Sequence, residues 1–542
     1  MSRPSELTRR RLIASGASSF LVAALFGDAA LAQDATPAAG ETPFAATPEG
    51  SYAPQTGIEW DEFIVGVQAL PSNVDPAQNL GNVGSRINTT PYDTLIRRDF
   101  LNNNVNVPML AESWQQVSDT VLELKLREDV TFHDGSPMTS DDVVYTFDRM
   151  INAAEDSPLL DAGTRFITFK SVEAIDPYNV RITTKAPDPV LINRLASWAS
   201  WIVSKNYIET NGQEKFEQTG MGTGPFKFTS FTPDTEITLE RHDGYWGDLP
   251  PVKKITFRVI PEVAARVTAL ANGEVHLITN VPPDQVSGLE EMDHVDVRDV
   301  ILSNTHVLVY NTHQAALSDK RVRQALNLGI DRQLLIDTIW GGHARAKHSE
   351  QMEEFGPLYN PDRPLTPYDP DKAKQLLADA GYDGAEIPYQ TGANYYTNSG
   401  AAAQAIVPMW QDLGINAVAA ISEEEVADED HFVYTWSNSS ILADPDGYLT
   451  RCWGPNSSPQ LASWDAPQEF NDLAVKAQST LDVQERYDCY QRMLDIWEDE
   501  APGTVLYDPA EFYAIDKRVN WSPYPLYNMD LRAYNLSFNE EK

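Results

Sequence analysis

Residues 131–145 read TFHDGSPMTSDDVVY and pass from an apolar alternation through a turn into a helix. The overlapping segment 121–132 alternates apolar and polar side chains, as a half-buried strand requires. Residues 134–137, Asp-Gly-Ser-Pro, are typical of a turn. Thr139 and Asp142 then have the spacing of a capping box ahead of apolar residues at helical intervals. The stretch therefore predicts a strand, a turn and a helix in succession.

The same succession of strand and helix signals continues along the chain. Residues 255–259 alternate as a strand, and Pro261 opens the helix that follows it. Asp369 caps a second helix, which Gly381 ends, and Asp482 starts a third helix with two apolar stripes. The whole pattern predicts a mixed α/β protein in which helices pack on sheets.

The composition limits what such a chain does. It has 542 residues, several times the length of a usual domain, so we expect more than one folding unit. Asp and Glu number 79 against 41 Lys and Arg, and the net charge of -38 repels phosphate backbones, which excludes a general nucleic-acid binder. The two cysteines, Cys452 and Cys489, are too few for a disulfide scaffold or a multi-cysteine metal cluster.

The first 32 residues have the features of an export signal. Residues 8–13, Thr-Arg-Arg-Arg-Leu-Ile, precede a weakly apolar stretch, and residues 30–32, Ala-Leu-Ala, suit a signal peptidase. The paired arginines resemble twin-arginine signals, which export folded proteins. We expect residues 1–32 to be cleaved, with a retained membrane anchor as the alternative, and residues 33–57 to form a flexible linker. No cysteine lies near the cleavage point, so we expect a periplasmic or extracellular protein without a lipid anchor.

Signatures of the commoner enzyme classes do not occur in the sequence. It contains no G-x-S-x-G elbow, no Walker A loop and no H-E-x-x-H motif. Gly220, Gly222 and Gly224 imitate part of a dinucleotide loop, but a strand-like segment follows where a phosphate would need a helix N-terminus. The histidines are not spaced as paired ligands on one helical face, and residues 444–447 lack the other ligands of a calcium loop. We therefore expect no enzyme, no metal and no cofactor.

Four stretches together carry a family resemblance. They are residues 131–145, residues 222–226 (GTGPF), residues 241–247 (RHDGYWG), and residues 318–327 (SDKRVRQALN) with Ile330-Asp331-Arg332. In sequence, order and spacing they resemble the family 5 extracytoplasmic solute-binding proteins of ABC importers, the group that contains oligopeptide, dipeptide and nickel binders. The likeness runs from near residue 60 to the C-terminus.

The resemblance implies an α/β fold of two hinged lobes, the type II periplasmic-binding-protein-like architecture with an inserted subdomain. Lobe I would hold residues 58–303 and 505–542, with the subdomain near residues 90–218, and lobe II would hold residues 304–504. Two chain crossings would act as hinges while the lobes close on a ligand. Such a monomer captures a peptide-like or other small polar organic ligand and delivers it unchanged to the permease subunits of an ABC transporter.

Family ligands lie against the segment that follows a lobe II strand, which matches residues 433–453 here. The resemblance therefore implies ligand contacts from Trp436, Asn438, Ser439, Ser440, Ile441, Arg451 and Trp453. The clustered hydroxyl and amide groups resemble hydrogen-bond donors to a polar ligand. Large aromatic side chains are usually buried for packing, so a core position is the alternative for both tryptophans.

Ile441 is where this sequence departs from the family's pattern. Peptide-binding members generally carry an Asp three positions ahead of an acidic-Pro pair, where it pairs with the amino terminus of the ligand; here that pair is Asp444-Pro445. An unpaired ammonium in a closed cleft costs several kcal/mol. Unless Asp444 or another acid substitutes, the ligand is expected to be a modified peptide or an oligosaccharide and not an ordinary peptide.

Two questions stay open at this level. A disulfide between Cys452 and Cys489 would add about 3–4 kcal/mol of stability in an oxidising compartment, but a protein that folds before export is stable without it. A secreted hydrolase with paired carboxylates in the same cleft, and a sensor domain that uses the same closure, are the competing functions.

Overall fold

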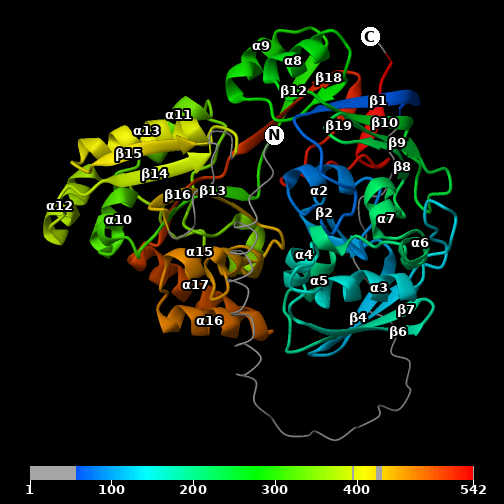
Figure 1. Ribbon diagram of the computed structural model, residues 1–542, viewed down its shortest axis with the longest axis horizontal. Coiled ribbons are helices and arrows are strands. Elements are labelled where there is room, and N and C mark those ends of the chain that lie inside the picture. The colour runs from blue at the N-terminus through cyan, green and yellow to red at the C-terminus, as the bar shows by residue number, and fades with distance from the viewer. Residues whose placement is uncertain (1–56, 393–395, 423–429, 541–542) are drawn as a thin grey trace, which may run out of the picture.

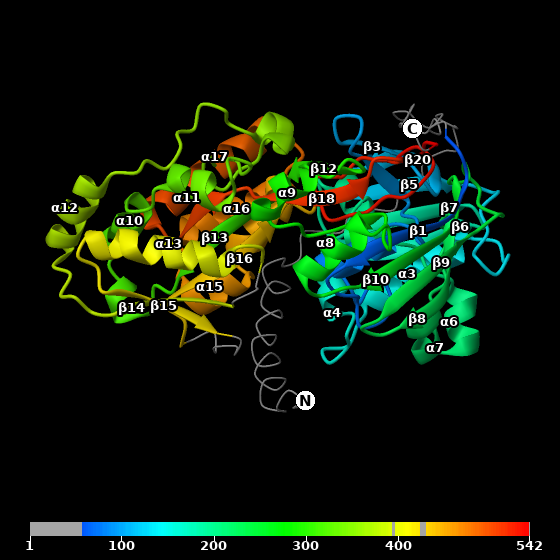
Figure 2. The same cartoon turned by 90° about the horizontal axis from the view of Figure 1, so that it is seen from above.

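The computed structural model describes residues 57–392, 396–422 and 430–540. Figures 1 and 2 show two α/β bodies side by side, each with helices packed on its own sheets. We call residues 60–301 with 510–538 the first body and residues 304–507 the second body. The α/β class expected from the sequence is confirmed. The export signal (1–32) and, apart from Gly57, the linker (33–57) lie outside the described residues.

A seven-stranded mixed sheet forms one part of the first body. In spatial order its strands are β12 (Val295–Ile301), β18 (Ala510–Asp516), β11 (Leu277–Ile278), β1 (Trp60–Val67), β10 (Val252–Val259), β9 (Glu236–Arg241) and β8 (Phe226–Thr232). The central strand β1 pairs in parallel with both neighbours, and the other pairs are antiparallel. Helices α8 (Val263–Ala271) and α9 (Val286–Glu290) contact β11 and β12 respectively.

A four-stranded antiparallel sheet forms the other part of the first body. Its strands, in spatial order, are β4 (Ala111–Ser118), β5 (Val121–Leu126), β7 (Asn179–Thr184) and β6 (Phe169–Asp176). Six helices belong to the same region: α2 (Asn82–Asn88), α3 (Ser140–Ile151), α4 (Leu160–Thr164), α5 (Leu191–Leu195), α6 (Lys205–Asn211) and α7 (Gln213–Thr219). Two short ribbons complete the body: β2 (Ile96–Asp99) with β3 (Val105–Pro108), and β19 (Val519–Trp521) with β20 (Leu536–Phe538).

The second body is built on a five-stranded mixed sheet. Its strands, in spatial order, are β15 (Ala417–Ser422), β14 (Ile387–Gly392), β16 (Val433–Ser439), β13 (Asn304–Tyr310) and β17 (Gly503–Tyr507). Its helices are α10 (Lys320–Leu328), α11 (Arg332–Ile339), α12 (Pro370–Ala380), α13 (Ser399–Asp412), α14 (Leu449–Trp453), α15 (Ser458–Ser463), α16 (Gln468–Ser479) and α17 (Val483–Glu500). In the described ranges of both bodies, no helix combines the length and the apolar character that a membrane crossing needs.

The chain passes between the two bodies twice. It leaves the first body after β12, which ends at Ile301, and returns after β17, which ends at Tyr507. The two crossings lie against each other, because the Leu302 amide donates to the Pro509 carbonyl at 2.9 Å. Two adjacent backbone segments of this kind can serve as the hinge for a motion of one body relative to the other.

The local signals in the sequence locate the helix starts correctly. Helix α3 begins after Thr139, which forms the capping box with Asp142. Asp369 caps α12, and Gly381 ends it in the left-handed conformation. Asp482 caps α17, which is buried on more than one side as its two apolar stripes predict. The alternation in residues 121–132 continues as strand only to Leu126.

The glycines at 222 and 224 serve close backbone packing. The strand β8 follows them, as the sequence predicted, so no helix N-terminus is present there to bind phosphate. A Cβ added at Gly224 would lie 2.5 Å from the Thr90 carbonyl oxygen and 2.6 Å from the Pro91 carbonyl carbon. Only glycine allows the two segments of backbone to approach this closely.

Gly224→Ala is therefore expected to lower the free energy of unfolding by about 1–3 kcal/mol, because the backbone of residues 90–91 must move. Urea unfolding followed by circular dichroism measures the loss. Gly288→Ala is the matched control, since a Cβ at this helical position meets nothing within 4 Å. The control is expected to be neutral or slightly stabilising, and equal stabilities for the two variants would contradict the packing argument.

Candidate functional site

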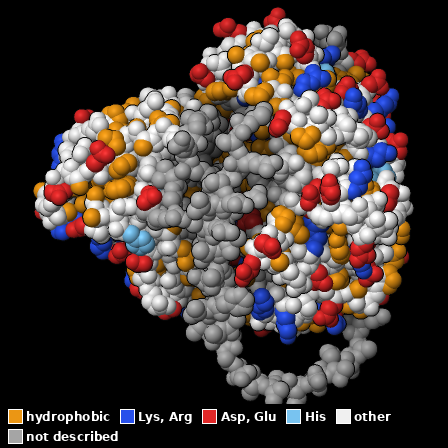
Figure 3. Space-filling model, in the orientation of Figure 1, with side chains coloured by type: hydrophobic (Ala, Val, Ile, Leu, Met, Phe, Trp, Pro, Cys, Tyr) orange, Lys and Arg blue, Asp and Glu red, His pale blue; other side chains and the backbone are white. Residues whose placement is uncertain are grey.

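A cavity of about 170 Å³ lies where the two bodies face each other. The first body lines it with Leu80, Gly81, Asn82, Arg165, Ser197, Trp198 and Ala199, and the second body lines it with Ser437, Ser439, Ile441 and Arg451. Figure 3 shows Asp and Glu side chains spread over the outer surface of both bodies. None of the described lining residues is acidic, so the charge of the cavity differs from that of the surface.

Two serines of β16 present their hydroxyls to the cavity. They are two positions apart on the strand, so both side chains lie on one face of the sheet. Asn304 on the neighbouring strand β13 donates from Nδ2 to the Ser437 hydroxyl at 2.8 Å and to the Ser439 hydroxyl at 2.9 Å. Ser437 donates back to Asn304 Oδ1 at 3.0 Å. The Ser439 hydroxyl only accepts in this network, so its hydrogen is available to a ligand.

Arg451 on α14 is held by neutral oxygen atoms. Its Nη2 donates to Asn438 Oδ1 at 2.7 Å and to the Ser439 carbonyl at 3.1 Å, and its Nε donates to the Gly447 carbonyl at 3.1 Å. Nη1 donates to no atom of the described residues. Burial lowers the pKa of Arg451, and the positive charge of Arg165 lowers it further. Both effects disfavour the charged form of Arg451.

Three of the residues implied by the resemblance line the cavity: Ser439, Ile441 and Arg451. Asn438 is fully buried and orients Arg451. Ser440 is also buried, and its amide donates to the Ser303 carbonyl at 2.8 Å next to the chain crossing. Its hydroxyl has no partner in the described part of the chain. Asn438 and Ser440 are therefore not among the residues that line the cavity.

The two tryptophans of the segment do not line the cavity. Trp453 has no exposed surface, packs edge-to-face against Trp464 and Trp497, and donates from its indole to Glu350 at 2.8 Å. This is the core position that the sequence left as the alternative for Trp453. Trp436 is half-buried and packs against the same core.

The acids beside the cavity are already paired. Asp444 accepts from Arg486 at 2.7 Å and Asp446 accepts from Arg194 at 2.6 Å, and all four side chains are buried. Burial raises the pKa of Asp444 although Arg486 opposes it. Neither acid lines the cavity.

Contacts of the segment after β16 hold the two bodies together. Arg194 on α5 belongs to the first body, and its partner Asp446 belongs to the second. Asn193 donates to the Leu442 carbonyl at 2.8 Å. Val190 packs with Ile441 and Leu442 in a small apolar cluster. The structure is therefore a closed arrangement, with an ion pair, a hydrogen bond and an apolar contact across the interface.

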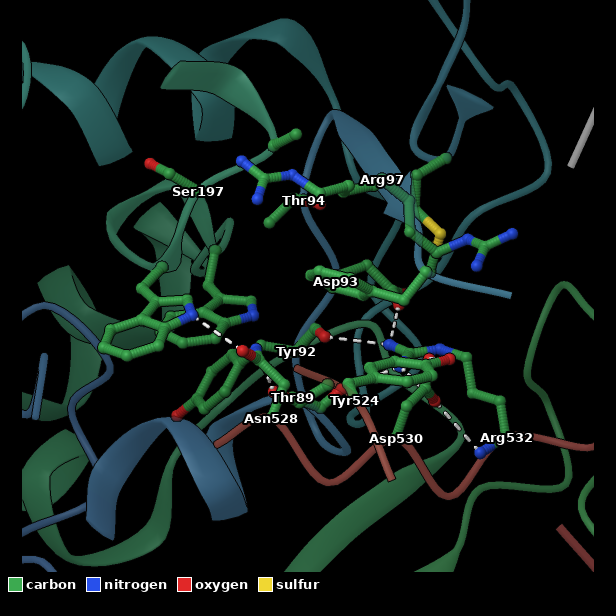
Figure 4. Close-up of a pocket in the computed structure, with 16 residues that line it drawn as sticks. Thr89, Tyr92, Asp93, Thr94, Arg97, Ser197, Tyr524, Asn528, Asp530 and Arg532 are labelled. Atoms are coloured by element: carbon green, nitrogen blue, oxygen red, sulfur yellow. Dashed lines mark hydrogen bonds and ion pairs between the residues drawn. The ribbon is translucent and has the colours of Figure 1, made fainter. Parts of the chain in front are cut away.

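A second cavity, of about 60 Å³, lies inside the first body and shares Ser197 and Trp198 with the first cavity. Figure 4 shows its floor, where Arg532 lies between Asp93 and Asp530. Arg532 donates to Asp93 Oδ1 at 2.5 Å and to Asp530 Oδ1 at 3.0 Å. These charges satisfy one another, so this network is a structural element of the wall.

The sequence did not point to the lining residues of the first body. Arg165 and its i,i+4 partner Asp161 look like an ordinary surface pair on a helix, and Ser197 and Trp198 belong to no motif. They reach the cavity only because the tertiary fold brings them opposite residues 437–451. No local signal could have identified them.

Both cysteines are buried and free, so the Cys452–Cys489 disulfide that the sequence left open is not formed. Burial raises the pKa of each thiol. Within the described residues, no group of three or more His, Cys, Asp or Glu side chains is arranged to hold a metal ion.

Two α/β bodies joined by two chain crossings, with a polar cavity between them, have the architecture of periplasmic binding proteins. The chain belongs to the bacterial extracellular solute-binding proteins of family 5, whose middle-region profile matches residues 106–460. It is 25% identical to the dipeptide-binding protein of Escherichia coli (strain K12), over 76% of this chain and 83% of that protein. It is 27% identical to the glutathione-binding protein GsiB of Pectobacterium atrosepticum, over 82% and 88% of the two chains.

The fold is also found in solved structures. The periplasmic binding protein DppA of Helicobacter pylori, in complex with the peptide STSA, matches with a TM-score of 0.78 and 24% identity over 89% of this chain and 99% of that chain. The expected two-lobed binding-protein fold is thereby confirmed, and with the family membership the chain is a solute-binding protein.

Proposed function

We propose that this protein captures a small, polar, peptide-like solute between its two lobes and delivers it to the permease of an ABC importer. The observation that carries the proposal is the closed cavity, to which both bodies contribute hydroxyl, guanidinium and aromatic groups. We take the lobes to be residues 58–303 with 508–542, including a subdomain near 90–218, and residues 304–507, because β17 (Gly503–Tyr507) belongs to the sheet of the second body and moves the boundary expected at 505. Closure over the cavity desolvates the solute, and opening releases it.

The relatives support this assignment. The similar proteins named above are transport binding proteins, not enzymes, and their names refer to dipeptides and glutathione. By analogy we assign the protein a periplasmic location, export by a twin-arginine signal in residues 1–32, and action as a monomer without a lipid anchor. The solute leaves chemically unchanged, which distinguishes binding from the hydrolase considered above.

Thermal unfolding of the full chain with a panel of short peptides tests the proposal. A peptide that binds only the folded protein is expected to raise Tm. At a peptide concentration of 100 times Kd, the free energy of unfolding rises by about 2.7 kcal/mol. The unlinked amino acids at equal concentration are the control, and mass spectrometry after incubation checks that the peptide is intact. A panel that leaves Tm unmoved, or a peptide recovered as fragments, would count against the proposed function.

A further inference from the structure

We propose that the solute carries a carboxylate and that this group is bound between the guanidinium groups of Arg165 and Arg451. The inference rests on the proposed function, because it takes the cavity between the bodies as the place of the solute. It specifies the charge of the solute and assigns one specificity-determining residue to each lobe.

The first observation is the charge balance of the cavity. Its described lining holds two arginines, one from each body, and no acid. Among the described residues Arg165 pairs with Asp161 alone, at 3.3 Å, and that carboxylate is 69% exposed. Water screens so exposed a carboxylate, so Asp161 offsets the positive charge of the two arginines only in part.

Arg98 of β2 adds to the same potential. It is 5% exposed, forms no ion pair with a described carboxylate, and donates to the carbonyl of Ile441 at 3.2 Å. Burial lowers the pKa of Arg98, and the more distant charge of Glu354 opposes this effect only in part. A buried cation without an acid is costly, and an anion in the adjacent cavity would offset part of that cost.

The second observation is the arrangement of donors around Arg451. Its Nε and Nη2 are fixed by neutral oxygens, while Nη1 donates to no described atom. Nε of Arg165 is likewise buried and without a hydrogen-bond partner in the described part of the chain. Guanidinium groups bind carboxylates through paired N–H donors, and the hydroxyl of Ser439 adds a further donor on the same side.

The third observation concerns cationic solutes. An ammonium group in this cavity meets two arginines, and the acids that follow β16 are engaged: Asp444 with Arg486 and Asp446 with Arg194. Ile441, which faces the cavity, offers an apolar side chain. The cavity therefore favours a solute with a free carboxylate and no free amine next to it.

Isothermal titration calorimetry of the full chain with four forms of the dipeptide Ala-Ala measures the effects of the free carboxylate and of the free amine on affinity separately. The forms are the N-acetylated acid, the free zwitterion, the N-acetylated amide and the free amine amide. The N-acetylated acid is expected to bind most tightly and the cationic amine amide most weakly, with affinities that differ by at least 100-fold. The carboxylate of the acid pairs with the arginines, whereas the ammonium group of the amine amide is repelled by them.

Two variants test the residues themselves. Arg451→Gln and Arg165→Gln are each expected to weaken binding of the N-acetylated acid by about 30-fold or more and to leave the neutral N-acetylated amide within about 3-fold. Arg492→Gln and Arg181→Gln are matched controls, because each removes an exposed arginine of the same body that pairs with a surface glutamate far from the cavity. Far-ultraviolet circular dichroism checks folding, and Arg165→Gln alone decides the question if the Arg451 variant does not fold.

The outcomes separate the inference from the function on which it rests. If the amine amide binds as tightly as the acid, or if both arginine variants keep the wild-type affinity, the carboxylate inference is wrong while peptide binding stands. If none of the four forms binds, the peptide-like function itself is contradicted and the inference falls with it.

Discussion

Arg532→Met is expected to lower the free energy of unfolding by about 3–5 kcal/mol, enough to unfold much of the protein at 37 °C. Arg532 is 4% exposed and lies between Asp93 and Asp530, which are 1% and 2% exposed (Figure 4). It also donates to the carbonyls of Thr89 at 2.8 Å and Tyr92 at 3.0 Å. Methionine fills a similar volume but leaves two buried carboxylates without a cation, and that desolvation penalty dominates the loss.

The pH dependence of the same variant gives a second readout. Burial raises the pKa of Asp530, but Arg532 and the hydroxyl of Tyr534 outweigh burial, so the pKa lies below the usual value of 3.8. A carboxyl with a depressed pKa stabilises the fold above its unfolded pKa and loses this contribution as the pH falls through its folded pKa. Without Arg532, only the hydroxyl of Tyr534 and the charge of Arg97 still oppose burial, so the pKa of Asp530 rises. As the pH falls from 7, the gap in stability between wild type and variant should therefore narrow, first as the raised pKa of Asp530 in the variant is passed and then, below about pH 4, as the wild type loses its own contribution.

Urea unfolding at pH 7 and at pH 4 measures both effects. Arg181→Met is the matched control, because its pair with Glu123 is half exposed and its loss should change stability by no more than about 0.5 kcal/mol. A loss below about 1 kcal/mol for Arg532→Met at pH 7 would show that the network is not stabilised by charge pairing in the way described.

The parts of the fold that the sequence predicts are those whose signal is local. The cap at Thr139 and the cap at Asp482 are each contained in a few residues, and the structure places helix starts at both. The segment 433–453, which the resemblance implies as a place of ligand contacts, contributes Ser437, Ser439, Ile441 and Arg451 to the lining of the cavity. Within that segment the resemblance could not separate cavity from core, and Trp453 lies in the core because Trp464 and Trp497 pack around it.

The opposite wall of the cavity could not be predicted. Residues 80–82, 165 and 197–199 are far from one another in sequence and carry no common motif. What joins them is tertiary packing, such as that of α4 on α3 and of α5 on β2, and packing of this kind depends on the whole fold. The acidic net charge also gave no hint of a cavity lined by arginines, because net charge is a property of the whole chain and none of the described acids lines this cavity.

Asp446→Asn is expected to shift the protein toward an open arrangement and to weaken solute binding by at least 10-fold, because one charge pair across the interface is lost. Arg194 lies between Asp188 of its own body at 2.8 Å and Asp446 of the other body at 2.6 Å. Burial lowers the pKa of Arg194, but both carboxylates outweigh it and the pKa lies above the usual value. In the variant Arg194 keeps Asp188, so each body stays folded while closure loses stabilisation.

Asp444→Asn is the matched control for this prediction. Asp444 is two residues away and equally buried, but its partner Arg486 belongs to the same body. Loss of the Asp444–Arg486 ion pair should lower the free energy of unfolding without changing how far the bodies close. Small-angle scattering with and without a solute that raises Tm should therefore show a larger radius of gyration for Asp446→Asn alone. If both variants scatter like the wild type and bind the solute equally well, the Arg194–Asp446 pair does not govern closure, and the other contacts across the interface, among them those of Arg98, Asn193 and Val190, are sufficient.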